Sequence, residues 1–278
     1  MFLLQDFMVQ EHIKNALKED IGFGDITTDC LIPEEAKMIA KLNTRQDGIL
    51  CGIDIFNTVF KVLSNEINIK TFFKDGDNIK KGDTLALIEG SAKAILTGER
   101  TALNYIQRLS GIATQTRKYQ EAAGLNKVKI TDTRKTTPCF RMFEKYAVYT
   151  GGAKLHRFNL SDCVMIKDNH IQYAGSITNA VNIIRKNISH THKIEVECDT
   201  IEQVKEAISV NADIIMLDNM DCALMKQCAE LINGRAVVEA SGNVTLDTIS
   251  LIAQTGVDII SSSSIAAKAK MLDMGLDI

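Results

Sequence analysis

Six short apolar runs alternate with helix-like segments through the second half of this chain, and this alternation restricts the fold more than any other feature. The runs cover residues 128–131, 163–166, 194–197, 213–217, 236–239 and 257–261. Short apolar runs are typical of strands that are buried on both faces of a parallel sheet. Because helices are expected between successive strands, the sequence predicts a parallel α/β architecture.

Each predicted strand is followed directly by polar side chains. They are Asp132, Arg134 and Lys135, then Lys167, Asp168 and Asn169, then Glu197, Asp218, Asn219, Glu239 and Ser241, and finally Ser261, Ser262, Ser263 and Ser264. In a β/α barrel the carboxyl ends of all strands converge on one mouth. In a doubly wound sheet they would spread along an edge, with chemistry at the switch point only. We therefore predict a partial, TIM-like β/α barrel.

The first part of the chain has a different pattern, which predicts a smaller α+β domain over residues 1–107. This domain is expected to contain an amphipathic helix that stops near Gly22, four strands and a second helix at 56–63. The expected strands cover residues 37–43, 48–51, 67–73 and 84–89. A long amphipathic helix from Glu99 leads into the barrel domain, which we place at 108–266.

Positive charge is concentrated between Arg134 and Arg157, although the formal net charge of the chain is -3. The basic residues there are Arg134, Lys135, Arg141, Lys145, Lys154 and Arg157, with Glu144 as the single acidic residue. A locally basic site on a mildly acidic protein suits a small polyanionic ligand, whereas binding of nucleic acid usually requires a basic domain.

Other features predict a cytoplasmic protein that does not cross a membrane. The chain has no uninterrupted run of eighteen apolar residues, and residues 1–10 lack the pattern of a signal peptide. The seven cysteines are an odd number without C-x-x-C spacing. This pattern argues against a disulfide framework or a zinc ribbon.

Several strand-end residues are candidates for chemistry. Arg134, Lys135 and Arg157 could bind carboxylate or phosphate groups. Lys167 could form a Schiff base or act as a cation for a substrate carboxylate. His156 could donate to an anionic substrate, but from its sequence setting alone a structural role is favoured.

Acidic and small residues complete the predicted mouth. Glu197 and Asp218 could ligate Mg²⁺, or could instead pair with Lys167 and Arg157. Two small-residue loops at predicted helix starts could hold phosphate. These loops are Ser241-Gly242-Asn243 and Ser262-Ser263-Ser264. No G-x-G-x-x-G or P-loop motif indicates a dinucleotide or ATP site.

Ordered motifs along the chain carry a resemblance to a known family. They include Glu99-Arg100-Thr101-Ala102-Leu103-Asn104, Asp132-Thr133-Arg134-Lys135-Thr136-Thr137-Pro138, His156-Arg157, Ile166-Lys167-Asp168-Asn169-His170, Glu195-Val196-Glu197, Leu217-Asp218-Asn219 and Glu239-Ala240-Ser241-Gly242. Over its whole length the sequence resembles the nicotinate-nucleotide pyrophosphorylase (carboxylating) family, also called quinolinate phosphoribosyltransferase.

The resemblance implies a reaction of quinolinate with phosphoribosyl pyrophosphate. The products are nicotinate mononucleotide, pyrophosphate and carbon dioxide, on the route to NAD, and the metal is Mg²⁺. The implied quinolinate contacts are Arg134, His156, Arg157, Lys167 and, from a neighbouring subunit, Arg100. The implied catalytic residues are Lys135, which contacts phosphoribosyl pyrophosphate, Lys167, and the metal and ribose ligands Glu197 and Asp218.

The resemblance also implies a homodimer, or a higher oligomer of dimers, with shared active sites. The tail at about 267–278 is expected to pack back on the first domain. Departures from the family pattern bear on the 5′-phosphate pocket. Asn243 stands at a common glycine, and residues 261–268 lack the usual glycine and Thr-His-Ser, so that Ser263 or Lys268 could supply the missing donors.

Overall fold

The computed structural model describes residues 4–124 and 128–278, which form two compact units. The beginning of the segment at 1–10 therefore lies outside the described residues. The first unit comprises Met1–Arg117, Met142–Gly152 and Ala269–Ile278, and the second comprises Lys118–Arg141 and Ala153–Lys268. Within the described residues, no helix combines the length and the apolar character needed to span a membrane.

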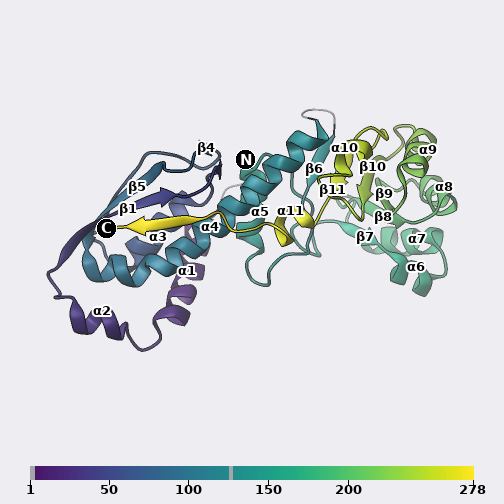
Figure 1. Cartoon of the computed structure of the whole chain (residues 1–278). Coiled ribbons are helices and arrows are strands. Elements are labelled where there is room, and N and C mark those ends of the chain that lie inside the picture. Colours follow the sequence, from purple (N-terminus) through teal and green to yellow (C-terminus); the bar gives the residue numbers. More distant parts are fainter. Residues whose placement is uncertain (1–3, 125–127) are drawn as a thin grey trace. The chain divides into compact units, whose positions relative to one another are not determined.

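The first unit is built on an antiparallel sheet in the order β12-β1-β5-β3. Its strands are β1 (Lys37–Thr44), β3 (Asn68–Thr71), β5 (Thr84–Ser91) and β12 (Met274–Asp277). A separate short pair consists of β2 (Gly48–Ile49) and β4 (Asn78–Ile79). Leu42 of β1 lies opposite Leu276 of β12, so the end of the chain completes a sheet that begins near its start (Figure 1).

The first unit also contains helices. They are α1 (Asp6–Ile21), α2 (Ile26–Leu31), α3 (Ile53–Leu63) and most of α4 (Ala92–Ala123) and α5 (Arg141–Thr150). Val9, Ile13 and Leu17 recur every fourth residue and give α1 one buried face, as the sequence predicts. The helix expected from Glu99 already begins at Ala92. Since α2 has only six residues, it is too short for a recognisable period, and it was missed.

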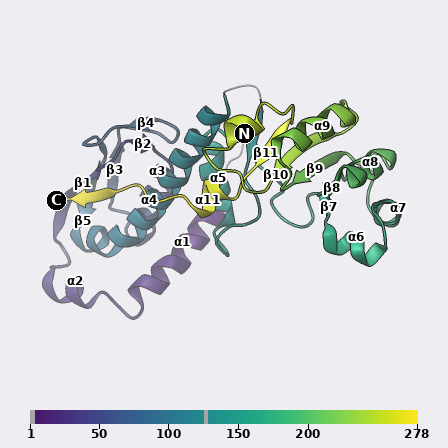
Figure 2. The same cartoon turned by 45° about the vertical axis from the view of Figure 1, so that its right-hand side comes forward.

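The second unit contains a six-stranded, wholly parallel sheet. Its strands are β6 (Lys129–Thr131), β7 (Val164–Ile166), β8 (Ile194–Cys198), β9 (Ile214–Asp218), β10 (Val237–Ser241) and β11 (Ile259–Ser261). Their order is β6-β11-β10-β9-β8-β7, so the first strand pairs with the last. Figure 2 shows β7 to β11 of this sheet. This cyclic order is that of a barrel with an open seam between β6 and β7, since the described residues of these two strands do not pair with each other. Thr131 at the end of β6 forms an isolated bridge with Lys154 in the loop before β7. All six strands and the partial barrel are confirmed.

The remaining helices follow the strands. They are α6 (Asp168–Ala174), α7 (Ile177–Asn187), α8 (Ile201–Ser209), α9 (Cys222–Ile232), α10 (Ile249–Ile252) and α11 (Ser264–Ala267). Thr200 and Gln203 form a capping box at the start of α8. From the sequence, a helix over 245–255 that stops at Gly256 would be expected, but α10 has only four residues. Hydroxyls of Thr245 and Thr248 bond to nearby backbone groups and compete with helical hydrogen bonds.

Alternation along the barrel strands places two kinds of side chain on opposite faces. On β8, for example, Val196 is fully buried on one face. Glu195 and Glu197, two residues apart, point to the other face, which is the interior of the barrel. The same period places Asp218 on β9 and Ser241 on β10 toward the mouth, where both line a cavity.

Candidate active site

Two cavities open at the carboxyl ends of the barrel strands, within the second unit. One, of about 350 Å³, is lined by cations and acids, namely Arg134, His156, Arg157, Lys167 and Glu197, together with Met165 and Met216. The other, of about 430 Å³, is lined by small and polar residues, namely Asn219, Gly242, Asn243, Val244, Thr245, Ser262, Ser263, Ser264 and Lys268. Thr133, Lys135, Asp218, Ser241 and Ser261 line both. We call the two cavities the cationic cavity and the serine cavity.

Two guanidinium groups give the cationic cavity its charge. Burial lowers the pKa of Arg134, and the nearby positive charges of Arg157 and Arg141 lower it further. Nε of Arg134 is buried and has no hydrogen-bond partner in the described part of the chain. An anion bound here would relieve the repulsion between the cations and would supply the missing acceptor.

Only half of the basic residues in the 134–157 stretch contribute to this site. Lys145 is fully buried in α5, within the first unit. Arg141 donates to the carbonyl oxygens of Phe158 and Arg134 and so ties two loops together. Lys154 is exposed beside the seam of the barrel. Of the six basic residues, Arg134, Lys135 and Arg157 line the cavities.

The ammonium group of Lys167 forms an ion pair with the Oε2 atom of Glu197. This contact matches one of the two alternatives for Glu197 and favours Lys167 as a cation over a Schiff-base lysine. Arg157 does not pair with Asp218, because its guanidinium donates to the Cys163 carbonyl at 2.8 Å. Asp218 instead accepts a 2.6 Å hydrogen bond from the Asn219 amide.

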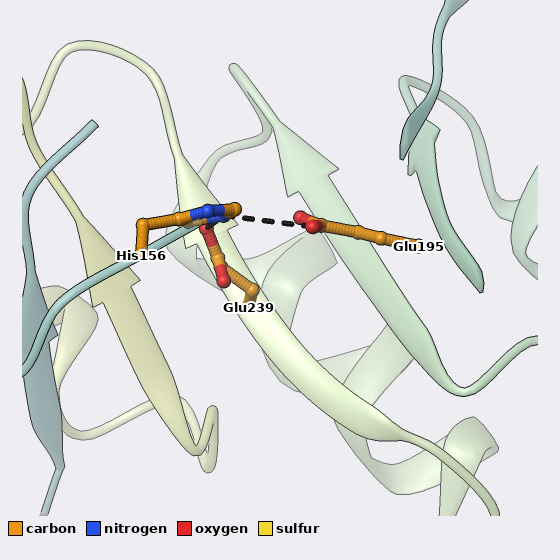
Figure 3. A group of neighbouring side chains, drawn as sticks. All are labelled: His156, Glu195 and Glu239. Atoms are coloured by element: carbon orange, nitrogen blue, oxygen red, sulfur yellow. Dashed lines mark ion pairs between the residues drawn. The ribbon is translucent and has the colours of Figure 1, made fainter. Parts of the chain in front are cut away.

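His156 extends into the interior of the barrel, where two glutamates meet it (Figure 3). Its Nε2 atom lies 3.5 Å from Oε2 of Glu195 and 3.3 Å from Oε1 of Glu239. Burial lowers the pKa of His156, but hydrogen bonds and negative charge from both glutamates outweigh burial and raise it to about 10. Burial also raises the pKa of Glu195. Both shifts favour an additional proton where Nε2 of His156 meets the two glutamates.

Sequence reasoning did not assign a role to Glu195 or Glu239. The available signal was the alternation Glu195-Val196-Glu197 within one strand, because two acids at positions i and i+2 must share a face. Since the outer face of that strand is covered by helices, both acids had to lie in the barrel interior. The structure confirms this placement, with both Glu195 and Glu239 buried.

The loops after β9 and β10 shape the floor of the serine cavity. Gly242 has a φ of 88°, and a Cβ atom there would lie 2.2 Å from Oδ1 of Asn219. Asn219 and Asn243 also have positive φ, and the Asn243 amide donates to Oδ1 of Asn219 at 3.1 Å. The expectation that Asn243 directly precedes a helix is wrong, since α10 begins at Ile249.

The predicted site residues of the barrel therefore meet around the two cavities. Arg100 is the exception, since it lies on α4 in the first unit and its side chain is exposed. All residues that line the two cavities belong to the second unit.

Comparison with known proteins identifies the family. The models for the N-terminal and C-terminal domains of quinolinate phosphoribosyl transferase match residues 25–110 and 112–277. The probable nicotinate-nucleotide pyrophosphorylase (carboxylating) of Bacillus subtilis is 43% identical over 263 residues, which cover 94% of this chain and 90% of that protein.

Two crystal structures extend the comparison to the fold. NadC from Streptococcus pyogenes shares 40% identity with a TM-score of 0.97, covering 100% of this chain and 98% of that one. The nicotinate-nucleotide pyrophosphorylase from Ehrlichia chaffeensis shares 44% identity with a TM-score of 0.92, covering 96% and 97%. These matches span both units and both cavities. The chain belongs to the quinolinate phosphoribosyltransferase family.

Proposed function

We propose that this chain converts quinolinate and phosphoribosyl pyrophosphate to nicotinate mononucleotide, pyrophosphate and carbon dioxide, a step of NAD biosynthesis. The observation that carries the proposal is the pair of adjoining cavities. Transfer of a ribosyl group requires two substrates whose reacting atoms meet. One cavity suits a dicarboxylate and the other a phosphorylated sugar, and five residues border both.

Quinolinate would bind in the cationic cavity. Arg134 and Arg157 would face its two carboxylates, since a planar guanidinium matches a carboxylate in two parallel hydrogen bonds. Lys167 would add a third cation once its ammonium group leaves Glu197 and pairs with a carboxylate of the substrate. The ring nitrogen would then point toward Asp218 and Lys135, which border both cavities.

Phosphoribosyl pyrophosphate would bind in the serine cavity. The loop at Ser241, Gly242 and Asn243 would approach its 5′-phosphate from one strand end. The second loop would do so from the neighbouring strand, with Ser262, Ser263 and Ser264, and Lys268 would supply a positive charge at the rim. Lys135 would contact the pyrophosphate that leaves.

The carboxylates at the junction of the cavities would act during the reaction. Attack of the ring nitrogen on the ribose places positive charge on the sugar, and Asp218 and Glu197 are placed to stabilise it. The pyridinium ring that results stabilises the electron pair left on its carbon when the adjacent carboxylate leaves as carbon dioxide, and a proton from solvent then takes the place of the carboxylate. Arg134 and Arg157 retain the other carboxylate during this loss.

Glu197 and Asp218 fit a Mg²⁺ site. They supply two carboxylates at the edge of a phosphate-binding cavity, and Mg²⁺ is commonly held by one or two carboxylates together with substrate phosphates and water. When bound there, the ion would neutralise charge on the pyrophosphate. The Lys167 ammonium would hold Glu197 in place when the ion is not bound.

We also propose that the enzyme is a cytoplasmic homodimer, or a larger assembly of such dimers, in which a neighbouring subunit supplies Arg100. An exposed apolar surface on the first unit supports a second copy, because Phe23 is 114% exposed and Ile26 is 80% exposed. The cytoplasmic location is supported by seven cysteines that are all free.

Subunit mixing tests the shared site. Arg100→Ala and Arg157→Ala should each be inactive alone. Their mixture, after dissociation and reassociation, should recover about a quarter of wild-type activity, because half of the dimers would be mixed and each would hold one intact site. Absence of recovery in a mixture shown to contain mixed dimers would argue against sharing.

Turnover tests the function itself. Purified protein with quinolinate, phosphoribosyl pyrophosphate and Mg²⁺ should release nicotinate mononucleotide, as followed by chromatography. Nicotinate offered in place of quinolinate should react poorly, because it lacks one of the two carboxylates that the cationic cavity would hold. A folded protein that forms no product from quinolinate would refute the proposal.

A further inference from the structure

The buried cluster of His156, Glu195 and Glu239 has no part in the mechanism above. The side chains are 11%, 0% and 3% exposed, and they come from the loop before β7, from β8 and from β10 (Figure 3). Both carboxylate oxygens of Glu195, and Oε1 of Glu239, are buried and have no hydrogen-bond partner other than His156 within the described residues. Nε2 of His156 lies 3.5 Å from Oε2 of Glu195 and 3.3 Å from Oε1 of Glu239.

The hydrogen bonds of the imidazole define its orientation. Nδ1 accepts a 2.7 Å hydrogen bond from the backbone N–H of Arg157. An accepting nitrogen carries no proton, so the ring proton lies on Nε2 and points at the two glutamates. Both ring nitrogens are thus engaged with the protein.

A metal ion would require the opposite arrangement. One histidine and two carboxylates are suitable ligands for a transition metal, and these three residues form such a group among the described residues. A histidine that binds metal through Nε2 carries its proton on Nδ1 and donates it to an acceptor. Here an N–H group faces Nδ1, so the geometry favours a hydrogen-bonded cluster.

The contacts of His156 connect its loop to three strands of the barrel. The backbone N–H of His156 donates to Oδ1 of Asp132 at 2.8 Å, and Asp132 directly follows β6. Through its ring, the same residue contacts β8 and β10. The loop that carries Arg157 is therefore held by the end of β6 on one side and by β8 and β10 on the other.

We infer that Glu195 and Glu239 are positioning residues, which act through His156 to aim the Arg157 guanidinium at a carboxylate of quinolinate. Arg157 is the next residue in the chain, and its amide bonds to the ring that the glutamates hold. Its guanidinium is tied only to the Cys163 carbonyl and the Met165 sulfur by the hydrogen bonds described. This inference rests on the proposed function, because it assigns Arg157 to quinolinate.

Steady-state kinetics of Glu195→Leu and Glu195→Gln test the inference. Leucine removes the acceptor, and we expect the KM for quinolinate to rise about 10- to 100-fold, as for other small displacements of binding groups. The KM for phosphoribosyl pyrophosphate should stay within about threefold, within the ordinary spread of single-site effects. Glutamine keeps an acceptor oxygen and should recover most of the lost affinity. Equal rises in both KM values, or no rescue by glutamine, would overturn the inference.

A double-mutant cycle with Arg157→Ala separates positioning from direct contact. If Glu195 acts through Arg157, Glu195→Leu should have little further effect on quinolinate KM once the guanidinium is absent. Additive effects would contradict the inference. Asp213→Ala is the matched control, because Asp213 accepts from the Ile194 amide beside Glu195 but belongs to no cavity described above. It should leave the quinolinate KM unchanged.

Two measurements on the wild-type protein do not depend on folding of the variants. Nitrogen-15 NMR should show the His156 ring proton on Nε2 and none on Nδ1, and the reverse tautomer would overturn the inference. Metal analysis of the purified protein should find no stoichiometric transition metal, whereas a bound metal that is lost in Glu239→Gln would also overturn it. If wild-type protein instead fails to turn over quinolinate, the proposed function fails, while the NMR result still tests the cluster.

Discussion

Gly242→Ala offers a quantitative test of how the serine cavity is built. The glycine has a φ of 88°, and an added Cβ would lie 2.2 Å from Oδ1 and 2.9 Å from the backbone nitrogen of Asn219. A left-handed backbone costs an L-residue roughly 1–2 kcal/mol. Displacing a packed neighbour adds about 1–3 kcal/mol. We therefore expect the free energy of unfolding of the barrel unit to fall by about 2–5 kcal/mol.

Gly234→Ala is the matched control for this experiment. Gly234 also has a positive φ, of 72°, but a Cβ there would meet nothing within 4 Å. Gly234→Ala should therefore lower the free energy of unfolding only by the backbone strain, which is roughly 1–2 kcal/mol. Denaturant unfolding of both variants measures the difference, which is the contribution of the overlap with Asn219. The KM for phosphoribosyl pyrophosphate should rise in Gly242→Ala alone.

A second substitution checks the cause of this effect. Asn219→Gly in the Gly242→Ala background removes the Oδ1 atom in closest approach, tolerates the positive φ of this position, and should recover part of the lost stability. If Gly242→Ala is as stable as Gly234→Ala and binds phosphoribosyl pyrophosphate normally, the described loop geometry is refuted. The same conclusion follows if the second substitution brings no recovery.

Three further predictions concern the first unit and the metal. Arg108→Ala removes the 2.8 Å partner of Glu144, whose side chain is 1% exposed, and should lower the free energy of unfolding by on the order of 3 kcal/mol in denaturant titration. Asp25→Ala removes the cap of α2 and should cost about 1 kcal/mol at neutral pH. Hydrogen bonds from Thr28 lower the pKa of Asp25 on folding, so this contribution is present above the unfolded pKa and should disappear as the pH falls through the folded one. EDTA should abolish turnover and Mg²⁺ should restore it; turnover that persists in EDTA would exclude a role for the metal.

The sequence was sufficient for the barrel because its signals are local and repeated. Each of the six strands is a short apolar run, and each has a polar residue at its carboxyl end. The fold rule that gathers these ends then brings Lys167, Glu197 and Asp218 to one cavity without further information.

What could not be predicted depends on contacts between distant residues. The basic stretch from Arg134 to Arg157 looks continuous in sequence, but Lys145 faces the core of the other unit. The link from His156 to Glu195 and Glu239 joins three separated segments. The sequence gives no local signal for such a link, since each residue alone is compatible with an ordinary structural role.

The predicted helix start near the loop at Ser241, Gly242 and Asn243 was wrong for another reason. Small polar residues favour both helix starts and turns, and hydrogen bonding of their side chains decides between these outcomes. At Thr245 and Thr248 the hydroxyls bond within a turn, so the helix is delayed to Ile249. The phosphate site proposed there therefore depends on loop amides and side chains, with little contribution from a helix dipole.

Quinolinate labelled with carbon-13 in the carboxylate next to the ring nitrogen tests the central claim most directly. The proposed function predicts that one labelled carbon dioxide is released for each pyrophosphate formed, and that the mononucleotide carries no label. Retention of the label in the product, or formation of pyrophosphate without release of carbon dioxide, would contradict the claim.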